Sequence, residues 1–128
     1  MSIQNLNAFI NSMWDWAVLD GCFGTTKIRP TDIDGLVERN GRFLLLEAKG
    51  VGKLVGRGQQ KVFDQLQRTG VFTIIIVWGD PGKPNRIALL TRHGTKHYER
   101  ATIATLRMIV SNWYQWADKQ RAQKRDDF

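Results

Sequence analysis

The sequence predicts an α/β fold in which helices flank a single mixed β-sheet. Two extended segments, 33–39 and 42–49, are separated by an Asn-Gly pair, the strongest short signal for a hairpin of antiparallel strands. A segment with helical periodicity follows and runs to about Arg68. The run 71–78 after it is apolar throughout, as in a strand buried on both faces that pairs in parallel after a helical crossover.

The remaining elements follow from periodicity and turn residues. Residues 3–18 carry apolar side chains at helical spacing, which predicts a first helix whose apolar stripe is buried. The glycine-rich stretch 50–58 is expected to form a flap-like loop. A turn at 79–82 leads to a further strand at 86–91, and a last helix is expected over 98–123. The predicted order is α, β, β, α, β, β, α.

Length and composition predict one domain over residues 1–128. Within it, 1–20 would hold the N-terminal helix, 31–91 the sheet with its crossover helix, and 98–123 the C-terminal helix. No apolar run reaches the roughly 18 residues of a membrane span, and the N-terminus lacks the order of a signal peptide. We therefore expect a cytoplasmic protein without a membrane partner. The single Cys22 excludes an internal disulfide and a multi-cysteine zinc site.

The hairpin should gather Asp34, Glu47 and Lys49 on one face. If the Asn-Gly pair forms a two-residue turn, Arg39 pairs with Arg42, and counting outward places Asp34 opposite Glu47. Two carboxylates about 5 Å apart repel by about 3 kcal/mol at an effective dielectric of about 20. A hard divalent cation, with Mg²⁺ as the natural candidate, accounts for this cluster better than Lys49 alone.

Two alternatives stay open at this cluster. Asp32 lies on the same expected face, opposite Lys49, and competes with Asp34 for the metal. We favour Asp34 because of its register and because the adjacent Gly35 permits a bent strand near a ligand, which leaves Asp32 to support the site or pair with Lys49. Glu47 and Lys49 could also be ordinary surface residues, although the apolar run leading into them is unusual for a solvated strand.

One ordered set of residues is similar to the motif of a known nuclease superfamily. The set is Asp34, Glu47, Ala48, Lys49, Gln59 and Gln60. It resembles the PD-(D/E)XK nuclease superfamily, which has the restriction-endonuclease-like fold with an αβββαβ-type core. The similarity spans about 30–78 and is closest in pattern to small VRR-NUC and Holliday-junction-resolvase-like members.

The resemblance implies a role for each motif residue. Asp34, Glu47 and the backbone carbonyl of Ala48 would bind the metal, and Lys49 would orient or activate the attacking water and stabilise the charge of the transition state.

A glutamine on the crossover helix would contact Lys49, the water or the substrate. The choice between Gln59 and Gln60 is nearly even. We favour Gln60, because its spacing from Phe63 and Leu66 places it nearer the buried side of the helix and leaves Gln59 in support.

The chain is strongly basic, with 19 Lys and Arg against 12 Asp and Glu and a formal net charge of +7. This balance favours a polyanionic partner. Candidate phosphate contacts are Arg29, Lys53, Arg57, Lys61, Arg92 and Lys96. Such contacts give affinity without reading base sequence.

These patterns predict a Mg²⁺- or Mn²⁺-dependent DNA endonuclease that hydrolyses phosphodiester bonds by metal-activated water and uses no other cofactor. One domain without an added recognition module would select DNA structure, such as the branches or nicks of repair and recombination. The resolvase resemblance would allow a homodimer, with an interface at whichever residue is exposed among Trp113, Tyr114 and Trp116. The alternative is a non-catalytic nucleic-acid-binding protein or a protein-interaction module on the same fold.

Overall fold

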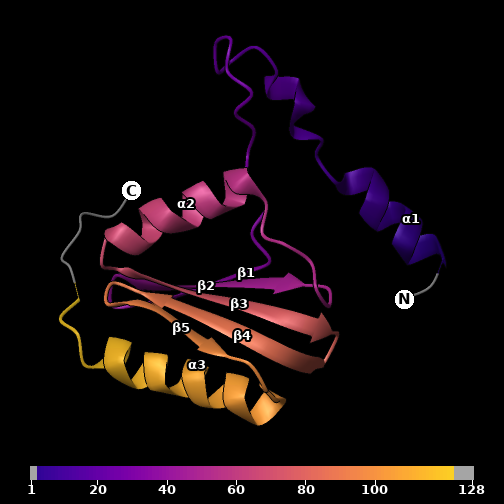
Figure 1. The fold of residues 1–128 in the computed structure, drawn as a ribbon. Helices are drawn as coiled ribbons and strands as arrows, with labels where there is room; N and C mark the ends of the chain where they lie inside the picture. The colour runs from indigo at the N-terminus through magenta and orange to yellow at the C-terminus, as the bar shows by residue number, and fades with distance from the viewer. Residues whose placement is uncertain (1–2, 123–128) are drawn as a thin grey trace. The chain divides into compact units, whose positions relative to one another are not determined.

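The computed structural model describes residues 3–122, which divide into two compact units between Pro30 and Thr31. The second unit is an α/β structure with one five-stranded mixed sheet in the order β1-β2-β3-β4-β5 (Figure 1). Helices α2 and α3 pack on its two faces. The predicted fold class is therefore confirmed. The expectation that both units belong to one domain stays a prediction.

The first unit differs from the expected single helix over 3–18. Helix α1 spans Ile3–Ser12, and a separate 3-10 helix spans Trp16–Leu19. The second helix begins at Asp15, whose side chain accepts a hydrogen bond from the Ala17 amide at 2.9 Å and so caps a new helix instead of continuing the old one. The apolar stripe predicted to be buried is exposed, and Trp14 has 74% of its surface accessible.

The hairpin forms as the sequence predicts. Strands β1 (Gly35–Arg39) and β2 (Arg42–Lys49) pair antiparallel, and the two arginines that flank the turn are partners. Asn40 and Gly41 have φ angles of 51° and 78°, the left-handed values that a two-residue turn of this kind requires. The predicted strand register, which places Asp34 next to Glu47, is therefore correct over the whole of β1, from Arg39 to Gly35.

Helix α2 (Arg57–Arg68) is the predicted crossover, and β3 (Phe72–Asp80) pairs in parallel with β2. Strand β4 (Lys83–Thr91) then pairs antiparallel with β3. In the part of the chain that the structure describes, no helix is long and apolar enough to cross a membrane.

The C-terminal part of the prediction is wrong in two places. A fifth strand, β5 (Gly94–Tyr98), occupies a segment expected to be a loop, because it pairs with β4 although its own sequence is polar. The last helix, α3 (Ile103–Asp118), begins five residues later than expected. Thr102 and Thr105 exchange hydrogen bonds in a capping box that fixes this start. The helix also ends earlier than expected, because Lys119 caps it after Asp118 and residues 120–122 are not helical; the expected end, Gln123, lies outside the described residues.

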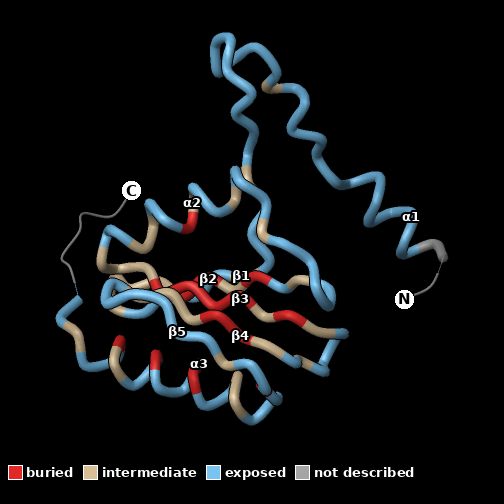
Figure 2. Tube along the Cα trace, in the orientation of Figure 1, coloured by how far each residue is buried: buried red, intermediate tan, exposed pale blue. Residues whose placement is uncertain are grey.

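The central strands are covered on both faces (Figure 2). Alternate residues of β2 and β3 enter two separate clusters, so that Leu45 and Phe63 belong to the cluster under α2, while Leu44 and Trp113 belong to the cluster under α3. We call these sides the α2 face and the α3 face. Each fully buried Leu or Ile contributes about 1.5–3 kcal/mol to folding. The apolar face of the hairpin, which includes Val37, is expected from its sequence to pack on the core, but the edge strand β1 is mostly exposed and Val37 is 43% exposed.

The hairpin turn is also joined to the end of α3. The Asn40 side-chain amide donates hydrogen bonds to the carbonyls of Ala117 and Asp118, each at 3.2 Å. Arg39 donates two more to the Asp118 carboxylate, at 2.6 and 2.8 Å. This hydrogen bonding, with the charge of Asp118, raises the pKa of the Arg39 guanidinium above its ordinary value. Asn40 thus serves both the turn and its connection to α3.

Substitutions at Asn40 can separate these two roles. We expect Asn40→Gly to lower the free energy of unfolding by about 1–2 kcal/mol, because glycine keeps the positive φ but loses both amide hydrogen bonds. Asn40→Ala should cost about 1 kcal/mol more, because alanine is strained in this conformation. Urea unfolding measures both differences. Equal stability of the glycine variant and the wild type would show that the amide bonds do not stabilise the fold.

Candidate active site at the end of strand β2

Glu47 is a buried carboxylate near the end of β2. Only 6% of the residue is exposed, and strand alternation from Leu45 places it on the α2 face together with Lys49. Its Oε1 lies 3.6 Å from the Lys49 Nζ. Its Oε2 is buried and has no hydrogen-bond partner among the described residues. Because a buried carboxylate oxygen without a partner is costly, this position favours an additional cation.

Asp34 lies just before β1, beside the same part of β2. The last pair of the hairpin joins Gly35 to Leu46, so Asp34 is next in register to Glu47. Its Oδ2 accepts a hydrogen bond from the Ala48 amide at 2.8 Å, where a strand partner would otherwise accept it. The carboxylate is therefore held at the sheet edge, next to the residue that separates Glu47 from Lys49. Its other oxygen is left available for a ligand.

Asp32 occupies a different environment. It is exposed and precedes the strand, and the β1–β2 pairing ends before it could reach the position opposite Lys49. Lys49 instead forms its ion pair with Glu47. The structure thus brings Asp34, Glu47 and Lys49 together and does not show the expected pairing of Asp32 with Lys49.

An open pocket of about 640 Å³ lies where β2 and β3 end, and both Asp34 and the segment 47–49 line it. Much of its apolar wall, including Val77 and Leu106, belongs to the α3 face. The Glu47 and Lys49 side chains project toward the α2 face, so the pocket meets their strand from the other side. Asp80 also lines this pocket, and the sequence reasoning missed it. The sequence feature that could have identified Asp80 is its position at the end of an apolar strand that pairs in parallel with β2.

The residue beside Lys49 in the sheet is Trp78. Its indole Nε1 donates a hydrogen bond of 2.6 Å to the carbonyl of Lys53, in the loop between β2 and α2. The Arg86 guanidinium lies 4.2 Å from the centroid of the Trp78 ring on which it stacks. The loop expected to behave as a flap is therefore attached to the strand next to the candidate site.

The two candidate glutamines of α2, Gln59 and Gln60, have the opposite burial from that expected. Gln59 is half-buried and Gln60 is exposed, because Gln59 lies four residues before the buried Phe63 and on the same helical face. The expectation that Gln60 lies nearer the buried side is therefore wrong. Neither glutamine hydrogen-bonds to Lys49 or Glu47 in the described structure. A catalytic role for Gln60 stays a prediction.

The six candidate phosphate contacts fall into separate places. Lys53, Arg57 and Lys61 are exposed on the loop after β2 and on the first turns of α2. Arg92 follows β4 at the opposite end of the sheet, since the end of β4 pairs with the beginning of β3. Arg29 belongs to the first unit.

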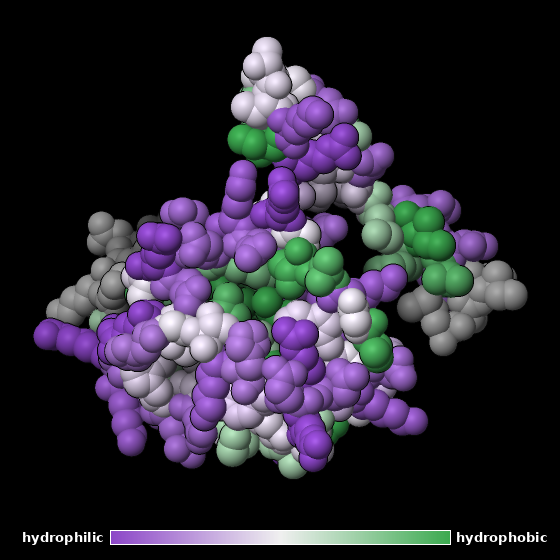
Figure 3. All heavy atoms as spheres, in the orientation of Figure 1, coloured by the Kyte–Doolittle hydropathy of each residue, from purple (hydrophilic) through white to green (hydrophobic). Residues whose placement is uncertain are grey.

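Lys96 lies on β5, with its ammonium 4.9 Å from the ring centroid of Tyr98. Hydrophilic residues also cover most of the visible face of the second unit (Figure 3). Among the candidates in the second unit, the group on the loop and α2 is the one that adjoins the strand end that carries Lys49.

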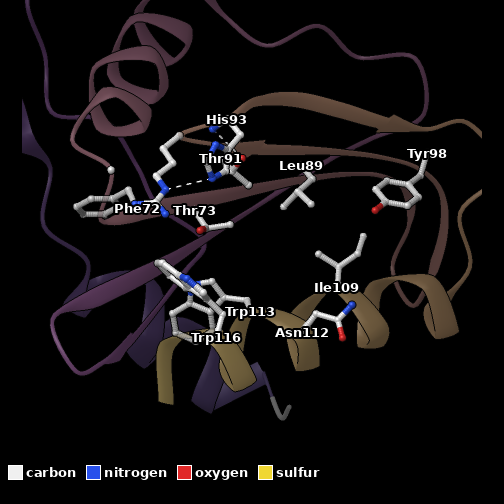
Figure 4. A pocket seen from close by; sticks show the side chains of 12 residues that line it. Phe72, Thr73, Leu89, Thr91, His93, Tyr98, Ile109, Asn112, Trp113 and Trp116 are labelled. Carbon is white, nitrogen blue, oxygen red and sulfur yellow. Dashed lines mark hydrogen bonds between the residues drawn. The ribbon is translucent and has the colours of Figure 1, made fainter. Parts of the chain in front are cut away.

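A second pocket, of about 300 Å³, lies between the sheet and α3 (Figure 4). Phe72 and Leu89 contribute from the strands, and Trp113 and Trp116 from the helix. Trp113 is only 6% exposed and belongs to the core, so it is not the exposed residue of the three that a dimer interface would use. Tyr114, 49% exposed, is the residue of the three with an open surface.

The donors at the strand end fit a hard divalent cation. Among residues 3–122, no group of three or more His, Cys, Asp or Glu is arranged to hold a metal ion. The expected ligand set is of another kind, because it combines the carboxylates of Asp34 and Glu47 with a backbone carbonyl. Oxygen donors of this type suit Mg²⁺ and Mn²⁺, and the partnerless Glu47 Oε2 is the observation that favours such an ion.

Comparison of the chain with protein-family models, curated proteins and solved structures finds no match in any of the three. The interpretation of this site therefore depends on its own geometry and on the motif resemblance.

The Glu47–Lys49 pair can be tested by its effect on stability without added metal. We expect Lys49→Met to lower the free energy of unfolding by about 1–3 kcal/mol, because it leaves the buried Glu47 charge without a counter-charge. Glu47→Gln, which removes that charge at almost constant shape, should be neutral or stabilising. The double variant should recover most of the loss. Additive losses in a urea-unfolding cycle with EDTA would contradict the interaction.

Proposed function

We propose that the protein is a metal-dependent DNA endonuclease of the PD-(D/E)XK type that hydrolyses a phosphodiester bond. The observation that carries this proposal is the buried Glu47 Oε2, which has no hydrogen-bond partner among the described residues. The other oxygen of this carboxylate, Oε1, lies 3.6 Å from the Lys49 Nζ, and the amide of the next residue, Ala48, donates to Asp34. Few structural roles need a buried carboxylate whose second oxygen lacks a partner at the end of a strand, whereas a cation-dependent site does. The five-stranded mixed sheet also suits this type of nuclease.

Each residue has a definite part in this chemistry. A bound Mg²⁺ or Mn²⁺ would supply Lewis-acid charge to the phosphoryl oxygen and lower the pKa of water. Asp34, Glu47 and the Ala48 carbonyl would hold the ion. The Lys49 ammonium, 3.6 Å from Glu47, would orient the attacking water and stabilise the negative charge that grows on the phosphate. Hydrolysis then breaks one phosphorus–oxygen bond and leaves a phosphate on one fragment and a hydroxyl on the other.

DNA is the proposed substrate because the chain carries a formal net charge of +7 and because basic residues follow the site along the chain. Lys53, Arg57 and Lys61 are all exposed on the segment after β2 and suit phosphate contacts that do not read sequence. Selectivity for branched or nicked DNA and assembly as a homodimer belong to the same proposal. An interface around Tyr114 would serve the dimer.

Cleavage assays test the function directly. We expect the protein to cut supercoiled, nicked or four-way-junction DNA with Mg²⁺ or Mn²⁺ and not with EDTA. Lys49→Ala should reduce the rate by at least about 100-fold, because it removes a cation placed to stabilise the transition state. Lys119→Ala is the matched control, since Lys119 is exposed at the end of α3.

Other outcomes of this assay identify the alternatives. DNA binding without cutting, with metal present, would indicate a non-catalytic nucleic-acid-binding protein. Neither binding nor cutting would indicate a protein-interaction module.

Calorimetry with Mn²⁺ tests the proposed ligands independently of DNA. Asp34→Asn and Glu47→Gln should each abolish ion uptake, because each replaces an anionic oxygen ligand by a neutral amide. Asp32→Asn should bind Mn²⁺ as the wild type does, because Asp34 and not Asp32 is held against β2 by the Ala48 amide. The reverse pattern, with uptake lost only in Asp32→Asn, would assign the metal to Asp32.

A further inference from the structure

Leu54 projects from the loop between β2 and α2 with 90% of its surface exposed. The residues on each side of it are held in place. The carbonyl of Lys53 accepts the 2.6 Å hydrogen bond from the Trp78 indole, and Val55 packs against the core cluster of the α2 face. Leu54 is therefore presented outward by two anchored neighbours.

The loop has further support close to the candidate site. The Lys53 amide donates to the Gly50 carbonyl at 3.1 Å, which closes a tight turn, and Gly52 within that turn has a φ of 70°. Trp78 itself is only 6% exposed and lies beside Lys49 in the sheet. The support for Leu54 thus comes from the strand pair that carries the proposed catalytic residues.

The surroundings of Leu54 are cationic. Residues 53–61 contain Lys53, Arg57 and Lys61 and no acidic side chain. Val51, in the same loop, is also exposed, at 59%, but Leu54 is the more exposed of the two. An outward apolar side chain among cations suits a partner that has anionic groups outside and apolar surfaces inside. Stacked bases between two phosphate backbones have this arrangement, and apolar side chains of DNA-binding proteins insert between such bases.

We propose that Leu54 is a wedge that inserts between two neighbouring bases beside the phosphodiester to be cut. This inference rests on the proposed nuclease function and deepens it by naming the substrate class. A nick, flap or branch already has an interrupted base stack, so insertion costs less there than in intact duplex. The wedge accounts for selectivity toward DNA structure.

The test measures base unstacking without catalysis. A DNA duplex with 2-aminopurine next to a nick is titrated with protein in EDTA, and fluorescence anisotropy of a labelled strand reports binding in parallel. Wild type should raise the 2-aminopurine fluorescence at least about twofold, because unstacking relieves quenching. Leu54→Ser should lose most of this rise while still binding, since its phosphate contacts remain.

Two further variants control for the apolar surface. Leu54→Phe should keep the fluorescence rise, because a flat apolar side chain also inserts between bases. Met108→Ser, at an exposed apolar position of α3, should behave as the wild type. In Mg²⁺, Leu54→Ser should also lose about tenfold in the ratio of nicked to intact duplex cutting, whereas Met108→Ser should keep that ratio.

The outcomes separate the two proposals. Equal fluorescence rises in wild type and Leu54→Ser, or binding without any rise, would overturn the wedge even if the protein cuts DNA. A Leu54-dependent rise without metal-dependent cutting would support the wedge and reject the nuclease. Absence of DNA binding would overturn the wedge as well.

Discussion

The buried carboxylate of Glu47 is the constraint on which the organisation of this molecule depends. It lies on β2, a strand that is packed on both faces, where a charge without compensation opposes folding. Lys49 offsets part of this charge at 3.6 Å, and the second carboxylate oxygen has no partner in the described structure. The chain therefore keeps an arrangement that is poor for stability alone and suited to binding a cation.

Two different pairings of β2 serve the site in different ways. The antiparallel hairpin brings Asp34, just before β1, to the Ala48 amide near the end of β2. An acid that precedes one strand thus lies at the end of the other. The parallel pairing with β3 brings Trp78 beside Lys49, and its indole attaches the following loop. One strand thus positions the acids and the other positions the segment that would meet the substrate. The same loop carries both the cations and the exposed Leu54.

Elements specified by local signals were predicted well, and elements that depend on distant partners were not. The Asn40-Gly41 turn fixes its own register through backbone conformation, so the hairpin was correct from the turn outward. Strand β5 is polar along its length and forms because β4 offers it a free edge. Helix α1 has a regular apolar stripe, but Asp15 caps a separate helix and the stripe is not buried.

At the candidate site, the sequence by itself determined which charged residues the hairpin register places next to one another. Strand alternation and turn length are local geometry, so they can be counted from the sequence. Only the tertiary structure decided that Glu47 is buried with one oxygen unpartnered, that Gln59 and not Gln60 faces the core, and that Trp78 holds the loop. These properties arise from the packing of α2 and β3 on β2. Burial and hydrogen-bond completeness are set by neighbours far apart in sequence, and no local pattern encodes them.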